Sequence, residues 1–247
     1  MRISGIIPAR FASSRFPGKP LIDLEGKTMI QRVYEQAAAS GVFSELIVAT
    51  DDTRVADAVK RFGGTVAMTS PDLASGTDRC AAVATELTDT DVVINIQGDE
   101  PLLEPQQIAA LAQLFEQMPD LSIGSLAQQL ADSTDLQNPN VVKVVLDYQG
   151  FALYFSRQAI PFVRGADPDA WLTMGTFYKH IGMYGFRREV LLKISRLPQS
   201  PYEKLEQLEQ LRWLQQGWRI QMAITNFDTI GVDTPEDAEK VRSLLRG

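Results

Sequence analysis

The sequence has almost none of the residues that build disulfide frameworks or zinc sites. Its 247 residues include one cysteine, Cys80, and one histidine, His180. A single cysteine excludes a disulfide framework and a cysteine-rich zinc site, and it favours a reducing compartment. Apolar runs stay well short of the ~18 residues that span a membrane, and Ser4, Pro8 and Arg10 interrupt the apolar region that a secretory signal would need. We therefore expect a cytoplasmic protein with no membrane segment.

Basic charge is also scarce, except at the N-terminus. The chain has 24 Lys and Arg against 31 Asp and Glu, a net charge of −7, which disfavours binding to nucleic acid. Residues 1–20 carry Arg2, Arg10, Arg15 and Lys19 and no acidic residue. Because a basic segment on an acidic protein focuses potential toward a small anion, the first loop is a candidate anion site.

Short apolar runs alternate with helix-like segments over the first hundred residues. The pattern predicts strands at 3–8, 46–50, 65–68 and 91–97, and helices at 29–40, 53–62 and 78–87. This alternation is typical of a parallel sheet covered by helices on both faces, in which ligands bind beyond the carboxyl ends of the strands.

After Pro119 the alternation gives way to strands with few helices between them. Strands are predicted at 122–127, 141–146 and 152–156, and a loop at 164–169. We expect a mixed-sheet extension, at approximately residues 120–190, that binds substrate or forms a dimer. No linker is evident, so a single domain over residues 1–247 is expected.

The loop after the first strand has the composition of a phosphate site. Residues 8–20 read PARFASSRFPGKP, without the Gly-x-Gly-x-x-Gly of dinucleotide-binding folds and without the Lys-Ser or Lys-Thr of a P-loop. Three cations, two serines and a glycine can instead wrap a triphosphate with charge-assisted hydrogen bonds. The alternative is a solvated basic loop, but direct attachment to a buried strand favours anion binding.

Two aspartates are candidate Mg²⁺ ligands. Asp99 follows an apolar strand and should emerge at the carboxyl edge of the sheet beside the first loop, where a carboxylate near phosphates commonly holds Mg²⁺. The alternative is a turn aspartate that bonds its own backbone. Asp233 precedes a predicted helix, with Thr234 as the cap and Pro235 in the first turn. Because Thr234 supplies the cap, Asp233 is left to bind a metal or to compensate the helix dipole.

The pattern of residues 200–217 predicts one helix from Ser200 to Gly217, and Glu209 lies in its second half. A capping-box pattern opens this segment, and Glu209 falls inside the sector of its leucines. A carboxylate inside an apolar sector usually has a polar partner. The partner is either a ligand or Arg212, three residues on, in a simple ion pair.

Two weaker signals complete the set of candidates. The segment Ser75-Gly-Thr-Asp-Arg79 precedes a helix and offers hydroxyl and amide groups to a base or ribose, but such a sequence is common. Strand alternation places His180, Gly182 and Tyr184 on one face. From the residues alone, a lone histidine is more often structural than catalytic.

Taken together and in order, the motifs of this chain resemble those of the 3-deoxy-manno-octulosonate (Kdo) cytidylyltransferases. The resemblance rests on PARFASSRFPGKPL from Pro8, VATD ending at Asp51, SGTDR at 75–79, NIQGDEP at 95–101, ALYFSR at 152–157, HIGMY at 180–184, LEQLR at 208–212 and GVDTPED at 231–237. Sugar nucleotidyltransferases in general share the first and fourth of these motifs, whereas ALYFSR and LEQLR are specific to the Kdo enzymes.

The resemblance implies an α/β protein with a Rossmann-like nucleotidyltransferase (nucleotide-diphospho-sugar transferase) fold. Such a fold has a mixed, mostly parallel sheet with helices on both faces, and the family implies a homodimer. The implied reaction is CTP + Kdo → CMP-Kdo + diphosphate, which activates Kdo for lipopolysaccharide biosynthesis. Mg²⁺ is the implied cofactor, and the attack of the anomeric hydroxyl on the α-phosphorus is expected to be in line.

The resemblance also assigns roles by position. Mg²⁺ would bind Asp99 and Asp233, and these two residues with Lys19 and Arg15 would form the catalytic set. The residues implied around CTP are Pro8, Ala9, Arg10, Ser14, Arg15, Lys19, Ser75 and Gln97. Those implied around Kdo are Arg157, His180, Tyr184, Glu209 and Gln210.

Two other functions are compatible with the same residues. One is the same reaction on another acid sugar, such as 8-amino-Kdo or a sialic acid, although sialate enzymes have a first loop richer in Gly and Lys. The other is a non-catalytic sensor of a nucleotide or a sugar acid. The sequence also leaves open whether one or two Mg²⁺ ions take part.

Overall fold

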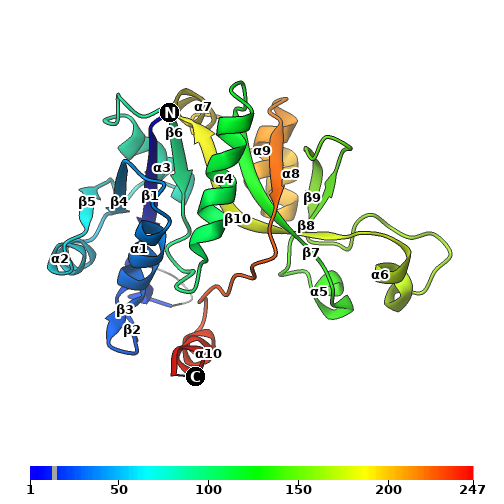
Figure 1. Ribbon diagram of the computed structural model, residues 1–247, viewed down its shortest axis with the longest axis horizontal. Coiled ribbons are helices and arrows are strands. Elements are labelled where there is room, and N and C mark those ends of the chain that lie inside the picture. The colour runs from blue at the N-terminus through cyan, green and yellow to red at the C-terminus, as the bar shows by residue number, and fades with distance from the viewer. Residues whose placement is uncertain (13–15, 247) are drawn as a thin grey trace.

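A nine-stranded sheet organises the computed structural model, which describes residues 1–12 and 16–246 (Figure 1). Its strands are β1 (Ile3–Ala9), β4 (Glu45–Thr50), β5 (Thr65–Met68), β6 (Val92–Asn95), β7 (Ile123–Gln129), β8 (Lys143–Leu146), β9 (Ala152–Ser156), β10 (Tyr178–Arg187) and β11 (Ile220–Ile224). The main path runs β11-β7-β10-β6-β1-β4-β5, and β8 and β9 extend from β10. Along this path only β10 runs antiparallel to its neighbours, so the prediction of a mixed, mostly parallel sheet is confirmed.

Helices cover both faces of this sheet. They are α1 (Met29–Ala39), α2 (Thr53–Arg61), α3 (Gly76–Ala84), α4 (Pro105–Gln117), α5 (Ser133–Gln137), α6 (Trp171–Met174), α7 (Arg188–Ile194), α8 (Pro201–Glu206), α9 (Gln210–Gln215) and α10 (Pro235–Arg246). Apolar residues of α1, α2 and α4 pack on one face, and those of α3, α7 and α9 pack on the other. None of these described helices combines the length and the apolar character needed to cross a membrane.

The strands at the centre of the sheet are buried on both faces. Val92, Val93 and Ile94 of β6 are completely buried. Such strands must be apolar at every position, which is why their continuous apolar runs predicted them. The expected alternation of strands and helices up to residue 97 is confirmed, with end shifts of a few residues.

The single helix expected from Ser200 to Gly217 is wrong. Two helices, α8 and α9, occupy this segment, and Gln207 between them adopts a left-handed conformation with φ 54°. Leu205, expected in the apolar stripe, is 80% exposed. The break turns the residues after Gln207 toward α3. The capping box at Ser200 is confirmed, because Glu203 and Ser200 bond each other's main-chain N–H groups.

The C-terminal segment returns to the start of the chain. After β11 it runs to α10, which lies beside the small hairpin β2 (Asp23–Leu24) and β3 (Lys27–Thr28) at the bottom of Figure 1. Val232, Ala238 and Val241 pack there against Leu24 and Met29. This packing brings the residues just before α10 next to those that follow the first loop.

Candidate active site

A cleft of about 360 Å³ opens beyond the carboxyl ends of β1 and β6. These two strands are neighbours in the sheet. From β1 the chain continues to β4 on one side, and from β6 it continues to β7 on the other side. Ligands of open α/β sheets bind at such a point, where the strand order reverses. Among the predicted site residues, the cleft is lined by Pro8, Ala9, Arg10, Lys19, Gln97 and Asp99. A second cleft, of about 500 Å³, lies before the starts of β7 and β11 and includes none of the predicted residues.

Lys19 joins the two predicted metal ligands. Its Nζ donates to Oδ2 of Asp99 at 2.8 Å and to Oδ1 of Asp233 at 3.2 Å. Asp99 and Asp233 are far apart in sequence, yet both reach one nitrogen whose side chain is only 14% exposed. The predicted convergence of the two aspartates beside the first loop is therefore present in the structure.

Local backbone geometry explains how these side chains meet. Lys19 begins a short 3-10 helix, η1 (Lys19–Leu21), after Gly18, whose φ of 75° is the left-handed conformation that glycine adopts without strain. Before Asp99, Gly98 passes so close to β1 that a Cβ would lie 2.7 Å from the carbonyl oxygen of Pro8. Only glycine fits there, so Asp99 lies directly beside the end of β1.

Asp233 owes its position to the start of α10. Asp237 accepts hydrogen bonds from the main-chain N–H groups of Asp233 and Thr234 at 3.0 and 2.9 Å, and the hydroxyl of Thr234 accepts from the Asp237 N–H at 3.2 Å. The predicted cap is therefore formed by Thr234 and Asp237. In addition, the Val232 N–H donates to the carbonyl oxygen of Asp99 at 2.8 Å, which ties the two aspartate segments together.

The donor set fits Mg²⁺ and does not fit an all-protein metal cage. Within residues 1–12 and 16–246, no three His, Cys, Asp or Glu side chains gather to hold a metal. Mg²⁺ needs only one or two carboxylates, since water and substrate phosphates complete its shell. The neighbouring Glu100 adds little charge at neutral pH, because burial, helped by the charge of Asp99, raises its pKa to about 8.

Several residues predicted to contact CTP form hydrogen bonds within the protein. Arg10 donates to the carbonyl oxygen of Leu73, and Gln97 Nε2 donates to the carbonyl oxygen of Gly182 at 2.8 Å. Ser75 caps α3 and forms part of a capping box with Asp78. Ser14 and Arg15, the remaining two predicted contacts, lie outside the described residues.

Arg79 is a cleft residue that the sequence analysis did not single out. Its side chain is completely buried, yet it lines the cleft. It donates to the hydroxyl of Thr69 and, at 3.3 Å, to Oδ2 of Asp51, and burial lowers the pKa of its guanidinium. The signal was present in the motifs that end at Asp51 and Arg79, which supply an acidic and a basic partner. Their contact depends on the packing of α3 against β4.

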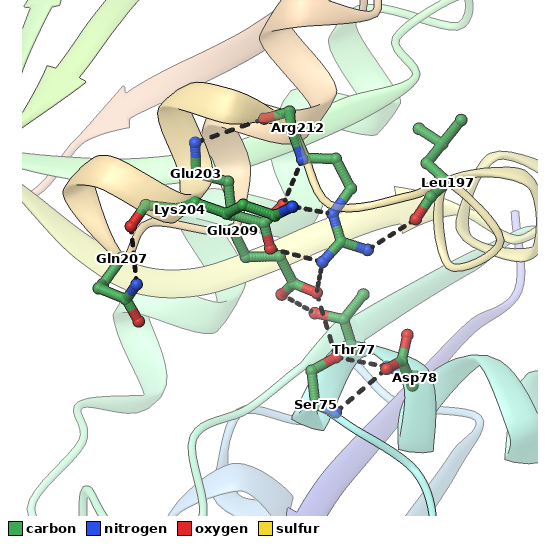
Figure 2. A network of polar contacts seen from close by, with 10 residues as sticks. Ser75, Thr77, Asp78, Leu197, Glu203, Lys204, Gln207, Glu209 and Arg212 are labelled. Carbon is green, nitrogen blue, oxygen red and sulfur yellow. Dashed lines mark hydrogen bonds and ion pairs between the residues drawn. The ribbon is translucent and has the colours of Figure 1, made fainter.

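Glu209 lies between α9 and the start of α3 (Figure 2). It accepts hydrogen bonds from the hydroxyls of Thr77 at 2.6 Å and Ser75 at 3.1 Å. Burial raises the pKa of its carboxyl, and these two hydrogen bonds oppose the rise. The alternative, an ion pair with Arg212, is also present: Arg212 Nη2 lies 4.0 Å from Oε1 of Glu209. The guanidinium forms its two shorter bonds, of 2.5 and 2.8 Å, with Glu203.

His180 and Tyr184 lie on the same side of β10, as the strand alternation predicted. Their ring centroids are 5.2 Å apart, and Tyr184 packs on Trp213 of α9. Burial and the charge of Glu209 raise the pKa of the Tyr184 hydroxyl. Gln210, the first residue of α9, is 5% exposed. Four of the five predicted Kdo residues therefore belong to β10 and to α9 with its preceding residue.

Arg157, the fifth, directs its guanidinium toward main-chain oxygens. Nε donates to the carbonyl of Glu206 at 2.7 Å, and Nη1 donates to that of Pro139 at 3.1 Å. These contacts hold Arg157 at the end of α8, just before the turn that leads to Glu209. Its pairing with a sugar carboxylate stays a prediction.

Comparison with known proteins finds similarity over the whole chain. The family model Cytidylyltransferase matches residues 4–223. Proteins named 3-deoxy-manno-octulosonate cytidylyltransferase from Porphyromonas gingivalis and Bacteroides thetaiotaomicron are each 51% identical to it. The alignments cover 99% of this chain and 96% of the first relative, and 100% and 99% for the second.

A solved structure of similar shape covers the same extent. It is described as CMP:2-keto-3-deoxy-manno-octonic acid synthetase complexed with CTP, and it superposes with a TM-score of 0.93 at 42% identity, over 100% of this chain and 99% of the other. A cytidylyltransferase from Leptospira borgpetersenii, 18% identical with a TM-score of 0.67, shares the fold. The similarity therefore includes both the sheet and the C-terminal helix.

Proposed function

The chain belongs to the cytidylyltransferase family and activates Kdo with CTP, and we propose that it does so with a Mg²⁺ ion held by Asp99 and Asp233. The reaction is CTP + Kdo → CMP-Kdo + diphosphate, and it prepares Kdo for lipopolysaccharide biosynthesis. In-line attack of the anomeric hydroxyl on the α-phosphorus is the step that the site residues must support.

One observation carries the metal proposal. The oxygens of Asp99 and Asp233 lie 2.8 and 3.2 Å from the same Lys19 nitrogen, so both carboxylates can reach one small cation. Lys19 and Asp99 line the same cleft as Arg10. A pair of carboxylates beside a basic phosphate site matches the ligands that Mg²⁺ takes in nucleotidyl transfer.

The residues of the chain bind and orient the reactants. Arg10, Arg15 and Lys19 neutralise the triphosphate, and Lys19 also keeps the two aspartates in place. When bound, Mg²⁺ would polarise the α-phosphoryl group and stabilise charge on the departing diphosphate. Positioning and charge stabilisation of this kind supply most of the catalysis in phosphoryl-type transfers.

The bond changes in this step balance without a protein base. The anomeric oxygen of Kdo forms a bond to the α-phosphorus as the bond from that phosphorus to the bridging oxygen breaks. The electron pair leaves on diphosphate, and the hydroxyl proton passes to solvent. The sugar acid would be held by Arg157, His180, Tyr184, Glu209 and Gln210, as the family motifs imply.

We also propose that the protein acts as a homodimer in the cytoplasm, where CTP is available. The extension at residues 120–190 exposes large apolar side chains, among them Leu153 at 62%, Phe162 at 73% and Met174 at 61%. Burial of these side chains in an interface would remove apolar area from water, which favours association. Sedimentation equilibrium should give twice the chain mass, and a monomer at micromolar concentration would refute the dimer.

A matrix of nucleotides and sugar acids tests the function directly. CTP, UTP, ATP and GTP are each combined with Kdo, 8-amino-Kdo, a sialic acid or no sugar, with Mg²⁺ or with EDTA, and diphosphate is measured. We expect release from CTP only when Kdo and Mg²⁺ are both present. Equal turnover with ATP or without a sugar acid would refute the proposal, and faster turnover with 8-amino-Kdo would change the substrate.

A further inference from the structure

Ser125 lies against the ring of the only histidine. It belongs to β7, is completely buried, and its Oγ is 3.0 Å from Nε2 of His180. The same Oγ lies 2.8 Å from the carbonyl oxygen of Met183 and 3.3 Å from that of Ile181. These carbonyls occur where β10 bulges, between Ile181 and Tyr184 in its pairing with β7. Ser125 therefore touches the bulge and the histidine at once.

The proton count at Ser125 fixes the histidine tautomer. A carbonyl oxygen only accepts, so at 2.8 Å the single hydroxyl proton of Ser125 must point to Met183. If that proton pointed to His180 instead, two oxygens with lone pairs would face each other at that distance. The Ser125 oxygen is thus left as an acceptor, and His180 Nε2 must carry the proton that it accepts. Nδ1 is then unprotonated.

We propose that Ser125 is a positioning residue that holds His180 in the Nε2–H tautomer, so that Nδ1 accepts a hydrogen bond from a hydroxyl group of the sugar acid. This inference rests on the proposed function for the identity of the ligand, and on the contacts of Ser125 for the tautomer. In this tautomer Nδ1 of His180 is a hydrogen-bond acceptor. It therefore recognises a hydroxyl donor, whereas a carboxylate, which only accepts, would face the Nδ1 lone pair.

The surroundings of the ring favour this neutral form. The rings of Phe155 and Tyr184 pack against His180 with centroids 5.0 and 5.2 Å away. Burial lowers the pKa of His180 to about 3, so the ring is neutral at pH 7. Within the part of the chain that the structure describes, Ser125 is the only hydrogen-bond partner of the ring.

A second polar group beside His180 has no internal partner. Tyr184 is 7% exposed, and its buried hydroxyl finds no hydrogen-bond partner among the described residues. A buried hydroxyl without a partner is costly unless a ligand or water satisfies it. His180 Nδ1 offers a hydrogen-bond acceptor and the Tyr184 hydroxyl offers a donor. Because the hydroxyl groups of a polyol both donate and accept, this pair is suited to bind one.

The tautomer can be measured without any variant. Because the chain has one histidine, the full-length protein labelled with ¹⁵N-histidine gives one pair of ring nitrogen signals. At pH 7 we expect Nε2 to be protonated and Nδ1 to show the shift of an unprotonated nitrogen. The opposite tautomer, or a protonated ring, would overturn the proposal.

Adding substrates then tests the contact. With CTP and Kdo under EDTA, at concentrations shown by calorimetry to saturate, the Nδ1 signal should shift as it accepts a hydrogen bond. An unshifted Nδ1 signal at saturation would overturn the sugar contact. Failure of the function itself gives a different result, since the activity matrix would then show no diphosphate released from CTP with Kdo, while the tautomer in the free protein stays as stated.

Ser125→Ala, with Ser4→Ala as a matched control, tests the role of the hydroxyl. Ser4 is also a completely buried strand serine, and its Oγ lies 2.7 Å from the hydroxyl of Thr90. Ser125→Ala should populate both tautomers and raise KM for Kdo about tenfold, the worth of one hydrogen bond, with KM for CTP unchanged. Ser4→Ala should leave tautomer and KM as in wild type. A wild-type tautomer in a folded Ser125→Ala protein would overturn the proposal, and if that variant does not fold, the wild-type spectrum decides.

Discussion

The ammonium group of Lys19 allows two carboxylates to occupy one small region. Like charges repel strongly at short separation in a partly buried site, so Asp99 and Asp233 would be driven apart without a cation between them. Lys19, with its side chain 14% exposed, reaches both. A preorganised pair of this kind would need little rearrangement to take the proposed divalent ion together with a triphosphate.

His180 gives the first prediction at the residue scale, which concerns stability against pH. Its folded pKa of about 3 is below the ordinary value of 6.5, so between these values the unfolded chain binds the proton more tightly. The free energy of unfolding must therefore fall as pH falls through this window. From pH 7 to pH 5 we expect wild type to lose about 2 kcal/mol more than His180→Asn, measured by urea unfolding.

The comparison with His180→Asn isolates the effect, because the chain has no other histidine. Other groups with shifted pKa values, such as Glu100 and Glu209, contribute to both proteins alike. Parallel pH dependence in the two proteins would show that His180 is not held neutral in the fold.

Individual site residues differ in how far the sequence alone could predict them. Asp99 was predictable, because it directly follows an apolar strand. Asp233 and Glu209 were ambiguous, since their partners Lys19 and Thr77 lie 214 and 132 residues away and meet them only through tertiary packing. Family resemblance, rather than local pattern, selected these two. The role of Ser125 was missed because it depends on a bulge in another strand.

At the scale of the elements, the break between α8 and α9 has a functional consequence. A continuous helix would run past α3, whereas the left-handed Gln207 redirects the chain so that Glu209 reaches the hydroxyls at the start of α3. The sequence predicted a helix here because the leucine spacing continues through the break. Helical periodicity does not detect a single left-handed residue when that residue is not glycine.

The link between α3 and α9 predicts the effect of Thr77→Val. This change keeps the shape of the side chain but removes the 2.6 Å hydrogen bond to Glu209. The largely buried carboxylate of Glu209 then keeps only one of its two hydroxyl donors. We expect this loss to lower the free energy of unfolding by about 2 kcal/mol at pH 7. KM for Kdo should also rise, because Glu209 is proposed to contact the sugar.

Thr85→Val, at the C-cap of α3, provides the control. Its hydroxyl donates at 3.0 Å to the carbonyl of Ala81 from an exposed position. We expect a change within about 0.5 kcal/mol and no effect on KM. Equal destabilisation by the two variants would mean that the hydrogen bond to Glu209 has no special weight.

At the scale of the whole molecule, the chain completes its site with its last segment. The strands β1 and β6 supply one side of the cleft, and the return from β11 to α10 supplies Asp233. The apolar strands could be predicted from the sequence because their burial on both faces leaves a local pattern. The antiparallel course of β10 and the return of α10 leave none, since they depend on contacts between distant segments.

Docking of α10 should therefore control activity. Val241 is completely buried against the residues around Leu24 and Met29. Val241→Asp places an unpaired charge there, so α10 should undock and carry Asp233 away from Lys19. We expect activity to fall by roughly a hundredfold or more, with the strand signal in circular dichroism retained.

Leu244→Asp is the matched control for this change. Leu244 is on the same helix but is 53% exposed, so the new charge remains in water. Its activity should stay close to wild type. Equal losses in the two variants would show that the charge of α10, and not its docking, affects the reaction.

The central claim is that Asp99 and Asp233 act together on one Mg²⁺ ion, and the Mg²⁺ dependence of turnover tests it most directly. Rates are measured over a Mg²⁺ titration for Asp99→Asn, Asp233→Asn, the double variant, and Glu236→Gln as an exposed acidic control. We predict that each single variant loses roughly a hundredfold or more and needs more Mg²⁺, that the double variant is no slower than the worse single one, and that the control matches wild type. A wild-type rate and Mg²⁺ dependence in either single variant, or losses that multiply in the double variant, would contradict the shared site.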